Sequence, residues 1–166
     1  MRHRVRGRKL GVKPAHRKAM GKNMVQALID HERIVTTIEK AKQFQPLAEK
    51  VINLAKVNNL TNVRRVNVLV GSRNLENQVT VTETTGEGKE AVKKVRVVAR
   101  TTLQKLFKDV GPRYAAKGDK KERSGGYTRI IKLARRRVGD NANQCLFELV
   151  ESRSPEGQTY TKDIAE

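Results

Sequence analysis

No aspartate or glutamate precedes Asp30, although the chain opens with MRHRVRGRKLGVKPAHRKAMGKN. Like charges at this density repel one another, so the segment cannot pack on itself unless a polyanion neutralises it. Residues 1–13 also lack hydrophobic periodicity and contain two glycines. We therefore expect a basic arm that is disordered when free. The cations before Asp30 are Arg2, Arg4, Arg6, Arg8, Lys9, Lys13, Arg17, Lys18 and Lys22.

The excess of positive charge extends to the whole chain of 166 residues, which carries 36 Lys and Arg against 17 Asp and Glu, a net charge of +19. Nucleic acid is the commonest partner of such a protein, and an acidic membrane surface is the alternative. Residues 1–13 lack the bulky apolar side chains that membrane-surface segments use. With 37% hydrophobic and 4% aromatic residues, we expect one domain with a lean aliphatic core.

The single cysteine, Cys145, excludes an intrachain disulfide and fits a reducing, cytoplasmic compartment. No apolar run approaches the roughly 20 residues of a membrane span. The basic start lacks the apolar region of a signal peptide. An organellar transit peptide is a closer alternative, but such peptides are rich in serine and the first serine here is Ser72.

Hydrophobic periodicity predicts a helix over about 15–32, followed by a strand over 34–37. Thr36 and Glu39 match a capping box for a second helix, in which Pro46 predicts a kink or break near residue 45. The predicted buried stripe of the first helix is Met20, Met24, Ala27, Leu28 and His31. That of the second is Ala41, Phe44, Ala48, Val51 and Ala55, with Leu47 and Leu54 alongside.

The second half of the chain is less regular. A polar turn is expected at 57–62, and the next stretch, through VNVLV, fits either a strand or the end of a buried helix. VTVT and VRVV suggest a hairpin over 79–82 and 95–98. A third helix through 103–110 should stop at Gly111-Pro112. After a charged loop at 115–126, a hairpin should pair 127–135 with 143–150 around a Gly139-Asp140-Asn141 turn.

These elements predict an α/β fold of two layers, with helices packed on one face of a small mixed sheet. The order is helix, strand, helices and C-terminal β-hairpin. We expect residues 1–13 to form the arm, 14–150 to form one domain with an insertion at about 70–98, and 151–166 to form an acidic tail.

Candidate catalytic groups are few. His31 beside Glu32 has no second ligand at i+4, so a helix-end histidine explains it better than a metal site. Cys145 alternates with Phe147 and Leu149 and fits a core position. Gly86-Glu87-Gly88-Lys89 lacks the spacing of a phosphate-binding loop. The sequence therefore predicts no enzyme, no metal and no cofactor, and an RNA-modifying enzyme stays a weaker alternative.

The basic residues point to phosphate instead, because arginine presents a planar fork that can bind phosphate through two hydrogen bonds. On an extended arm, alternation puts the arginines at 2, 4, 6 and 8 on one side. Tyr114 and Tyr127 fit either base stacking or core packing. Further basic candidates on the helices and the C-terminal hairpin are Arg64, Arg65, Arg113, Arg129, Lys132, Arg135, Arg136 and Arg137.

The motifs MRHR, AHRKAM, TTIEKAK, LAEKVINLAK, KLFKDVGPRYA, GGYTRIIK, GDNA and FELVE occur in this order. Together they closely resemble the family of the seventeenth protein of the bacterial large ribosomal subunit, over residues 1–65 and about 99–151. Glu39 replaces a proline that is frequent in the family. Residues 70–98 and the AAKGDKKERSGG stretch look longer than their counterparts.

The resemblance implies a structural protein that binds large-subunit ribosomal RNA near the exit of the nascent-peptide tunnel and touches neighbouring ribosomal proteins. No membrane partner and no homo-oligomer are expected. A free nucleoid-associated or RNA-chaperone protein is the main alternative. By motif, the RNA-contacting positions would include Arg2, His3, Arg4, Arg8, His16, Arg17 and Lys18, with Arg113, Arg129 and Lys132 as further candidates.

Overall fold

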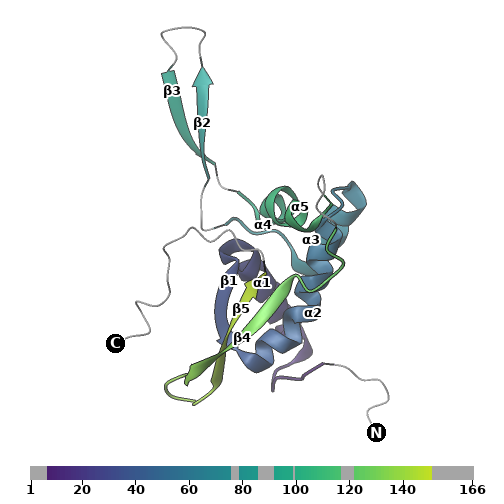
Figure 1. Cartoon of the computed structure of the whole chain (residues 1–166), viewed down its shortest axis with the longest axis vertical. Helices are drawn as coiled ribbons and strands as arrows, with labels where there is room; N and C mark the ends of the chain where they lie inside the picture. The colour runs from purple at the N-terminus through teal and green to yellow at the C-terminus, as the bar shows by residue number, and fades with distance from the viewer. Residues whose placement is uncertain (1–6, 76–78, 86–91, 99, 117–121, 151–166) are drawn as a thin grey trace.

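The computed structural model describes residues 7–75, 79–85, 92–98, 100–116 and 122–150, with β2 and β3 described by their backbone alone. Its main body has two layers, a three-stranded sheet and a set of helices that covers one of its faces (Figure 1). The predicted fold class is therefore confirmed. The predicted acidic tail and residues 1–6 of the arm lie outside the described residues.

The sheet has the order β1-β5-β4, formed by β1 (Arg33–Thr37), β5 (Asn143–Leu149) and β4 (Thr128–Arg136). Both pairings are antiparallel, so the expectation of a mixed sheet was wrong. The physical reason is that the hairpin's second strand, β5, lies between β1 and β4 and runs opposite to both. Cys145, Phe147 and Leu149 of this central strand are buried, which confirms that Cys145 is a core residue.

Helix α1 (Pro14–His31) follows its predicted bounds, with Pro14 at a first-turn position that suits proline. Its core face is different from the predicted stripe. Val25, Leu28 and Ile29 are buried, whereas Met20 and Met24 are half-buried and line a groove beside β1. Two adjacent apolar stripes share the helical period. The one that is buried belongs to the core formed with the other helices and the sheet, whereas Met20 and Met24 lie beside the edge strand β1.

Helix α2 (Ile38–Ala55) buries all five residues of its predicted stripe. Its N-cap is Thr37, whose side chain makes no capping bond, so the predicted Thr36 capping box was wrong. Thr36 is instead held in the strand opposite Cys145. The helix also continues without a break through Pro46, which lies on its exposed side.

Asn59 starts the next helix, α3 (Leu60–Val70), because its side chain accepts a hydrogen bond of 2.7 Å from the Asn62 backbone N–H. The ambiguous stretch before Gly71 is therefore helical. The predicted hairpin is confirmed as β2 (Val79–Thr85) paired antiparallel with β3 (Val92–Val98).

Thr101 and Gln104 form a capping box at α4 (Thr102–Lys105), which leads into a π-helical turn (Leu106–Val110) and α5 (Gly111–Tyr114). The predicted stop at Gly111-Pro112 was wrong. The Gly111 N–H bonds to the Leu106 carbonyl in the wide π register, so the chain enters Pro112 at the start of a new helical turn, where its missing N–H is tolerated.

Candidate nucleic-acid interface

The last part of the basic arm, residues 7–13, contacts the helices. Residues 7–13 contain a turn at Lys9–Val12, and the Arg8 backbone N–H donates to the Gln43 side chain on α2. The Arg17 guanidinium donates to the Lys9 carbonyl at 3.2 Å. These contacts place residues 7–13 against α1 and α2, and the disorder of the arm in the free protein stays a prediction. The sites Arg2, His3, Arg4 and Arg6 lie outside the described residues.

Helix α1 carries the next group of predicted cations on its surface. Lys13, His16, Lys18 and Lys22 are exposed and Arg17 is half-buried. No carboxylate lies on α1 before Asp30, near its C-terminal end, so no neighbour along the helix neutralises these charges. The Lys9–Arg17 bond places the arm beside α1, whose Arg17, Lys18 and Lys22 face α2 and α3, whereas His16 lines the groove beside β1.

The tip of the β4–β5 hairpin carries the second basic group. The strands extend beyond the sheet (Figure 1), and the register is irregular between Lys132 and Arg136. Lys132, Arg135 and Arg136 are exposed. No ion pair within the described residues involves these three, so their charges face solvent.

Arg137 differs from its neighbours because it pairs with Asp140 across the turn, with N–H to carboxylate contacts that include one of 2.9 Å. This pairing lowers the pKa of Asp140 to about 2, chiefly through the Arg137 hydrogen bond and then through the Ala142 backbone N–H. Gly139 and Asn141 adopt left-handed backbone conformations that close the turn. Arg137 therefore holds the tip in shape, and the tip presents Arg135 and Arg136.

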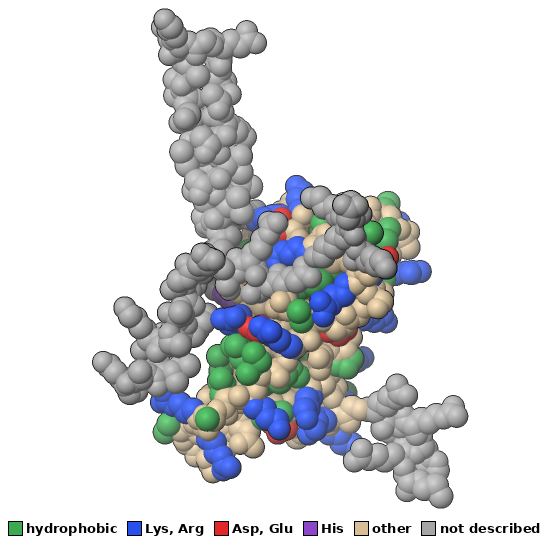
Figure 2. All heavy atoms as spheres, viewed as in Figure 1, with side chains coloured by type: hydrophobic (Ala, Val, Ile, Leu, Met, Phe, Trp, Pro, Cys, Tyr) green, Lys and Arg blue, Asp and Glu red, His purple; other side chains and the backbone are tan. Residues whose placement is uncertain are grey.

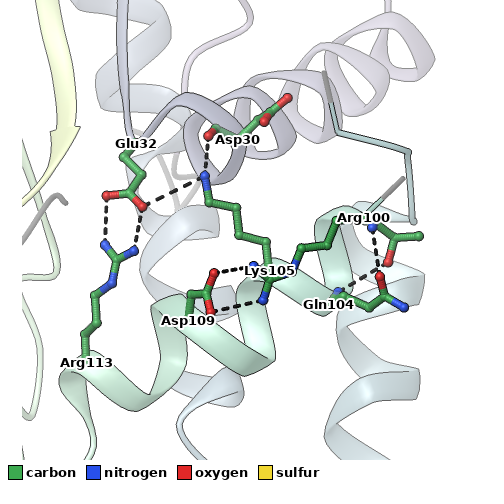
Figure 3. A network of polar contacts seen from close by, with 8 residues as sticks. Asp30, Glu32, Arg100, Gln104, Lys105, Asp109 and Arg113 are labelled. Carbon is green, nitrogen blue, oxygen red and sulfur yellow. Dashed lines mark hydrogen bonds and ion pairs between the residues drawn. The ribbon is translucent and has the colours of Figure 1, made fainter. Parts of the chain in front are cut away.

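Arg113 has an internal partner, contrary to what its position in a basic motif suggested. Its guanidinium makes two hydrogen bonds, of 2.6 and 2.7 Å, to the Glu32 carboxylate (Figure 3). The two side chains are only 9% and 8% exposed. Burial by itself would lower the pKa of Arg113, but the bonds to Glu32 outweigh it and raise the pKa. We leave Arg113 out of the RNA interface, because its charge is already neutralised inside the protein.

Glu32 and Asp30 also hold the helix that contains Lys105. The Lys105 ammonium donates to the Asp30 carbonyl and lies 3.9 Å from a Glu32 carboxylate oxygen (Figure 3). Burial lowers the pKa of Lys105 against the opposing effect of these acids. The same helical segment is tied to the chain before it, since Arg100 binds Asp109 through bonds of 2.6 and 3.0 Å. This network fixes the C-terminal end of α1 against α4, the π turn and α5.

Arg129 shares the buried carboxylate of Glu148 with Arg33, across three neighbouring strands. Glu148 is 1% exposed, whereas the Arg129 side chain is 55% exposed. One carboxylate between two guanidiniums leaves this face of the sheet positive. On the visible face of the body, Figure 2 shows Lys and Arg side chains with hydrophobic side chains between them. Arg129 can therefore still contact phosphate, as can the exposed Arg64 and Arg65 on α3.

Tyr114 and Tyr127 are both core residues, so base stacking is not their role. Each is 1% exposed, and their ring centroids lie 5.0 Å apart. Glu49, which holds the backbone at Tyr127 in place, gave no signal in the sequence. Its carboxylate accepts hydrogen bonds from the Tyr127 and Thr128 backbone N–H groups at 3.0 and 2.9 Å. Glu49 lies on α2 and its partners begin β4, so only the fold reveals the link.

The remaining candidates for catalysis are few within the described part of the chain. Its residues contain no group of three His, Cys, Asp or Glu side chains suited to hold a metal ion. His31 is exposed at the end of α1. No helix of the described segments is long and apolar enough to span a bilayer.

Burial raises the pKa of the Cys145 thiol, and the charge of Glu39 adds to the shift. The residue is 0% exposed. Since the thiolate is the reactive form, we expect native Cys145 to react with an aromatic disulfide reagent at pH 8 much more slowly than the urea-unfolded chain does. Absorbance of the released thiolate measures both rates, and equal rates would contradict the buried placement.

Comparison with known proteins gives a consistent result over most of the chain. The family model described as Ribosomal protein L17 matches residues 20–150. The chain is 46% identical to the large ribosomal subunit protein bL17 of Lactobacillus helveticus, over 86% of this chain and 98% of that protein. It is 38% identical to the bL17 of Trichlorobacter lovleyi, over 94% and 98% of the two chains, and 41% identical to that of Desulfotalea psychrophila, over 90% of each.

Proposed function

Since this chain belongs to the ribosomal protein L17 family and is a structural protein of the large ribosomal subunit, we propose that it binds large-subunit ribosomal RNA through two basic surfaces. The first, the arm–helix surface, comprises the basic residues of the arm and α1. The second, the hairpin tip, comprises Lys132, Arg135 and Arg136. Arg64, Arg65 and Arg129 are supporting contacts, and Arg137 shapes the tip.

The observation that carries this proposal is a concentration of exposed cations without acidic partners. The whole chain has a net charge of +19, and three of its acids, Asp30, Glu32 and Glu148, are buried carboxylates that pair with arginines of the fold. The charge left at the surface repels itself and is stabilised when phosphates take the place of counterions. The protein would thus let RNA segments pack closer than their own charge permits and support subunit assembly.

The placement near the exit of the peptide tunnel and the contacts with neighbouring ribosomal proteins belong to this proposal through the family resemblance. Sedimentation of a lysate at ribosome-preserving salt tests the cellular half of it. The chain should travel with large subunits, and a chain that stays in the light fractions or follows DNA would contradict the proposal.

Binding of the purified full chain to large-subunit ribosomal RNA should fall steeply with salt. Each phosphate contact contributes a slope of roughly 0.7–0.9 in log K against log salt. Replacing both Arg135 and Arg136 with alanine should weaken binding and reduce the slope by about 1.5, because two contacts are lost. Filter binding between 50 and 200 mM salt measures the slope.

The matched control replaces two exposed lysines outside the proposed surfaces, Lys50 and Lys108, with alanine. It removes the same charge and should reduce the slope by less than the tip variant does. Equal effects of the two pairs would show that net charge alone, and not the hairpin tip, governs binding.

Replacing Arg2, Arg4, Arg6 and Arg8 with alanine should impair incorporation into large subunits while the circular dichroism spectrum stays that of the wild type. Arg8, the one of the four within the described residues, is exposed. Loss of helix signal in the variant would contradict this separation of arm and fold.

A further inference from the structure

A pocket of about 460 Å³ opens where α1, α2 and α3 meet, within the range of small-ligand sites. Its apolar side chains come from α2 and α3, and its charged side chains come from α1. The lining residues are Arg17, Lys18, Gly21, Lys22, Gln43, Phe44, Leu47, Val68 and Leu69.

Gly21 lets the α1 backbone lie close against the floor of the pocket. A Cβ atom there would lie 2.8 Å from the Phe44 ring and 3.5 Å from a Leu47 methyl carbon. The bare backbone lets α1 settle on the ring and leaves its edge, with Leu47 and Leu69, as an apolar floor. Gly21 is a poor helix former that costs about 1 kcal/mol relative to alanine, so this geometry has a local cost that packing must offset.

The rim of the pocket carries only positive charge. Arg17, Lys18 and Lys22 are cationic, and no acid is among the nine lining residues. Lys18 and Lys22 are four residues apart on α1, so their side chains project from the same face of the helix. No carboxylate of α1 lies near these cations, because the first acid of the helix is Asp30, which is buried near its C-terminal end.

Residues 8 and 9 of the arm contact the rim of this pocket. The Arg8 backbone N–H donates to Gln43, and the Lys9 carbonyl accepts from Arg17, so two lining residues of the pocket hold the arm. The backbone of Arg8 and Lys9 therefore lies beside the rim. A ligand in the pocket would therefore meet an apolar floor, an amide group on one wall and a cluster of cations around the mouth.

That combination fits a nucleotide, which joins an apolar flat base to an anionic phosphate. We propose that this pocket binds one unpaired nucleotide of large-subunit ribosomal RNA, with its base on the floor of Phe44, Leu47 and Leu69 and its phosphates on Arg17, Lys18 and Lys22. The inference rests on the proposed RNA binding and specifies it. A base within a duplex is stacked and cannot enter, so the recognised nucleotide lies in a loop, bulge or strand end.

The test uses two probes that carry the same phosphates. The first is a single-stranded uridine hexanucleotide, and the second is the same hexamer without bases. Each is titrated into the purified full chain at low salt, with the leucine methyl groups followed by NMR. We expect shifts of the Leu47 and Leu69 methyl signals with the first probe only. Since a base contact in such sites is worth at least about a fivefold change in affinity, the first probe should also bind at least about five times more tightly.

Two variants separate the pocket from general charge. Lys22→Ala should reduce both the affinity for the hexanucleotide and the methyl shifts, whereas Lys50→Ala, an equal loss of charge at an exposed position of α2 outside the pocket, should leave the shifts unchanged. Equal affinity for the two probes, or binding without methyl shifts at Leu47 and Leu69, would overturn the pocket while large-subunit RNA binding stands. If the chain binds neither the hexamers nor large-subunit ribosomal RNA at low salt, the proposed function falls with it.

Discussion

Replacing Glu32 with glutamine is expected to lower the free energy of unfolding by about 3 kcal/mol, because the change removes one charge of a buried pair and leaves the other. Arg113 donates two hydrogen bonds to this carboxylate, and both side chains are more than nine-tenths buried. Lys105 lies 3.9 Å from it and would lose an opposing charge as well. Urea denaturation followed by circular dichroism measures the loss.

Glutamine is the informative substitute, since it keeps the size of the side chain. Glu32 also ends α1 in a left-handed conformation, with a φ of 60°, and glutamine meets the same backbone requirement. The change therefore removes the charge and turns one of the two acceptor oxygens into an NH2 donor, while side-chain size and backbone stay the same. The matched control is Asp140→Asn, which breaks the Arg137 pair at the hairpin turn. Its partners are about half exposed, so the unfolding midpoint should hardly move.

A double variant, Glu32→Gln with Arg113→Met, tests whether the cost is that of an uncompensated charge. Replacing Arg113, whose charge the first substitution leaves without its carboxylate partner, by an apolar side chain of similar length should recover part of the lost stability. The double-mutant cycle should show a coupling free energy of roughly 0.5–3 kcal/mol. Additive losses would mean that the pair does not act as a unit.

Replacing Gly111 with alanine is expected to destabilise the fold at or beyond the upper end of the roughly 1–3 kcal/mol that overpacking costs. The new Cβ atom would lie 2.2 Å from the Ala55 carbonyl oxygen and 2.7 Å from its carbonyl carbon. Both are backbone atoms of α2, so no side-chain rotation relieves the clash and the helices must separate. The same urea titration measures the effect.

Gly125→Ala is the control for this substitution. A Cβ atom at Gly125 would meet nothing within 4 Å, and the position does not need a left-handed backbone. The change should therefore stay within about 0.5 kcal/mol of the wild type. A Gly111 variant as stable as the Gly125 variant would show that α5 can move away from α2 at little cost.

The helices show how far hydrophobic periodicity reaches. It predicted α1 and α2 to within a few residues and all five buried positions of the α2 stripe. For α1 it was right for Leu28 but selected Met20 and Met24, whereas the core also took Val25 and Ile29. Both sets recur at helical spacing, and which of them faces the core depends on where the fold places the other helices and the sheet.

The basic residues show the same division. Composition and the acid-free start predicted that cations would dominate the surface, and Lys18, Lys22, Arg135 and Arg136 are exposed. Arg113 looked equivalent in the sequence, yet its partner Glu32 lies 81 residues earlier in the chain. Gly111-Pro112 looked like a helix end, but a π turn carries the chain through it. Such long-range pairings leave no local signal.

The sequence by itself determined the charge of this protein, the positions of its main helices and hairpins and the motifs of its family, because these follow from residue type and short-range spacing. Only the tertiary structure decided which arginines are neutralised by buried carboxylates, which face of α1 joins the core, and that three helices leave a cation-rimmed pocket over Phe44. Those outcomes depend on packing between segments distant in the chain, where burial and the pairing of charges compete for the same few positions.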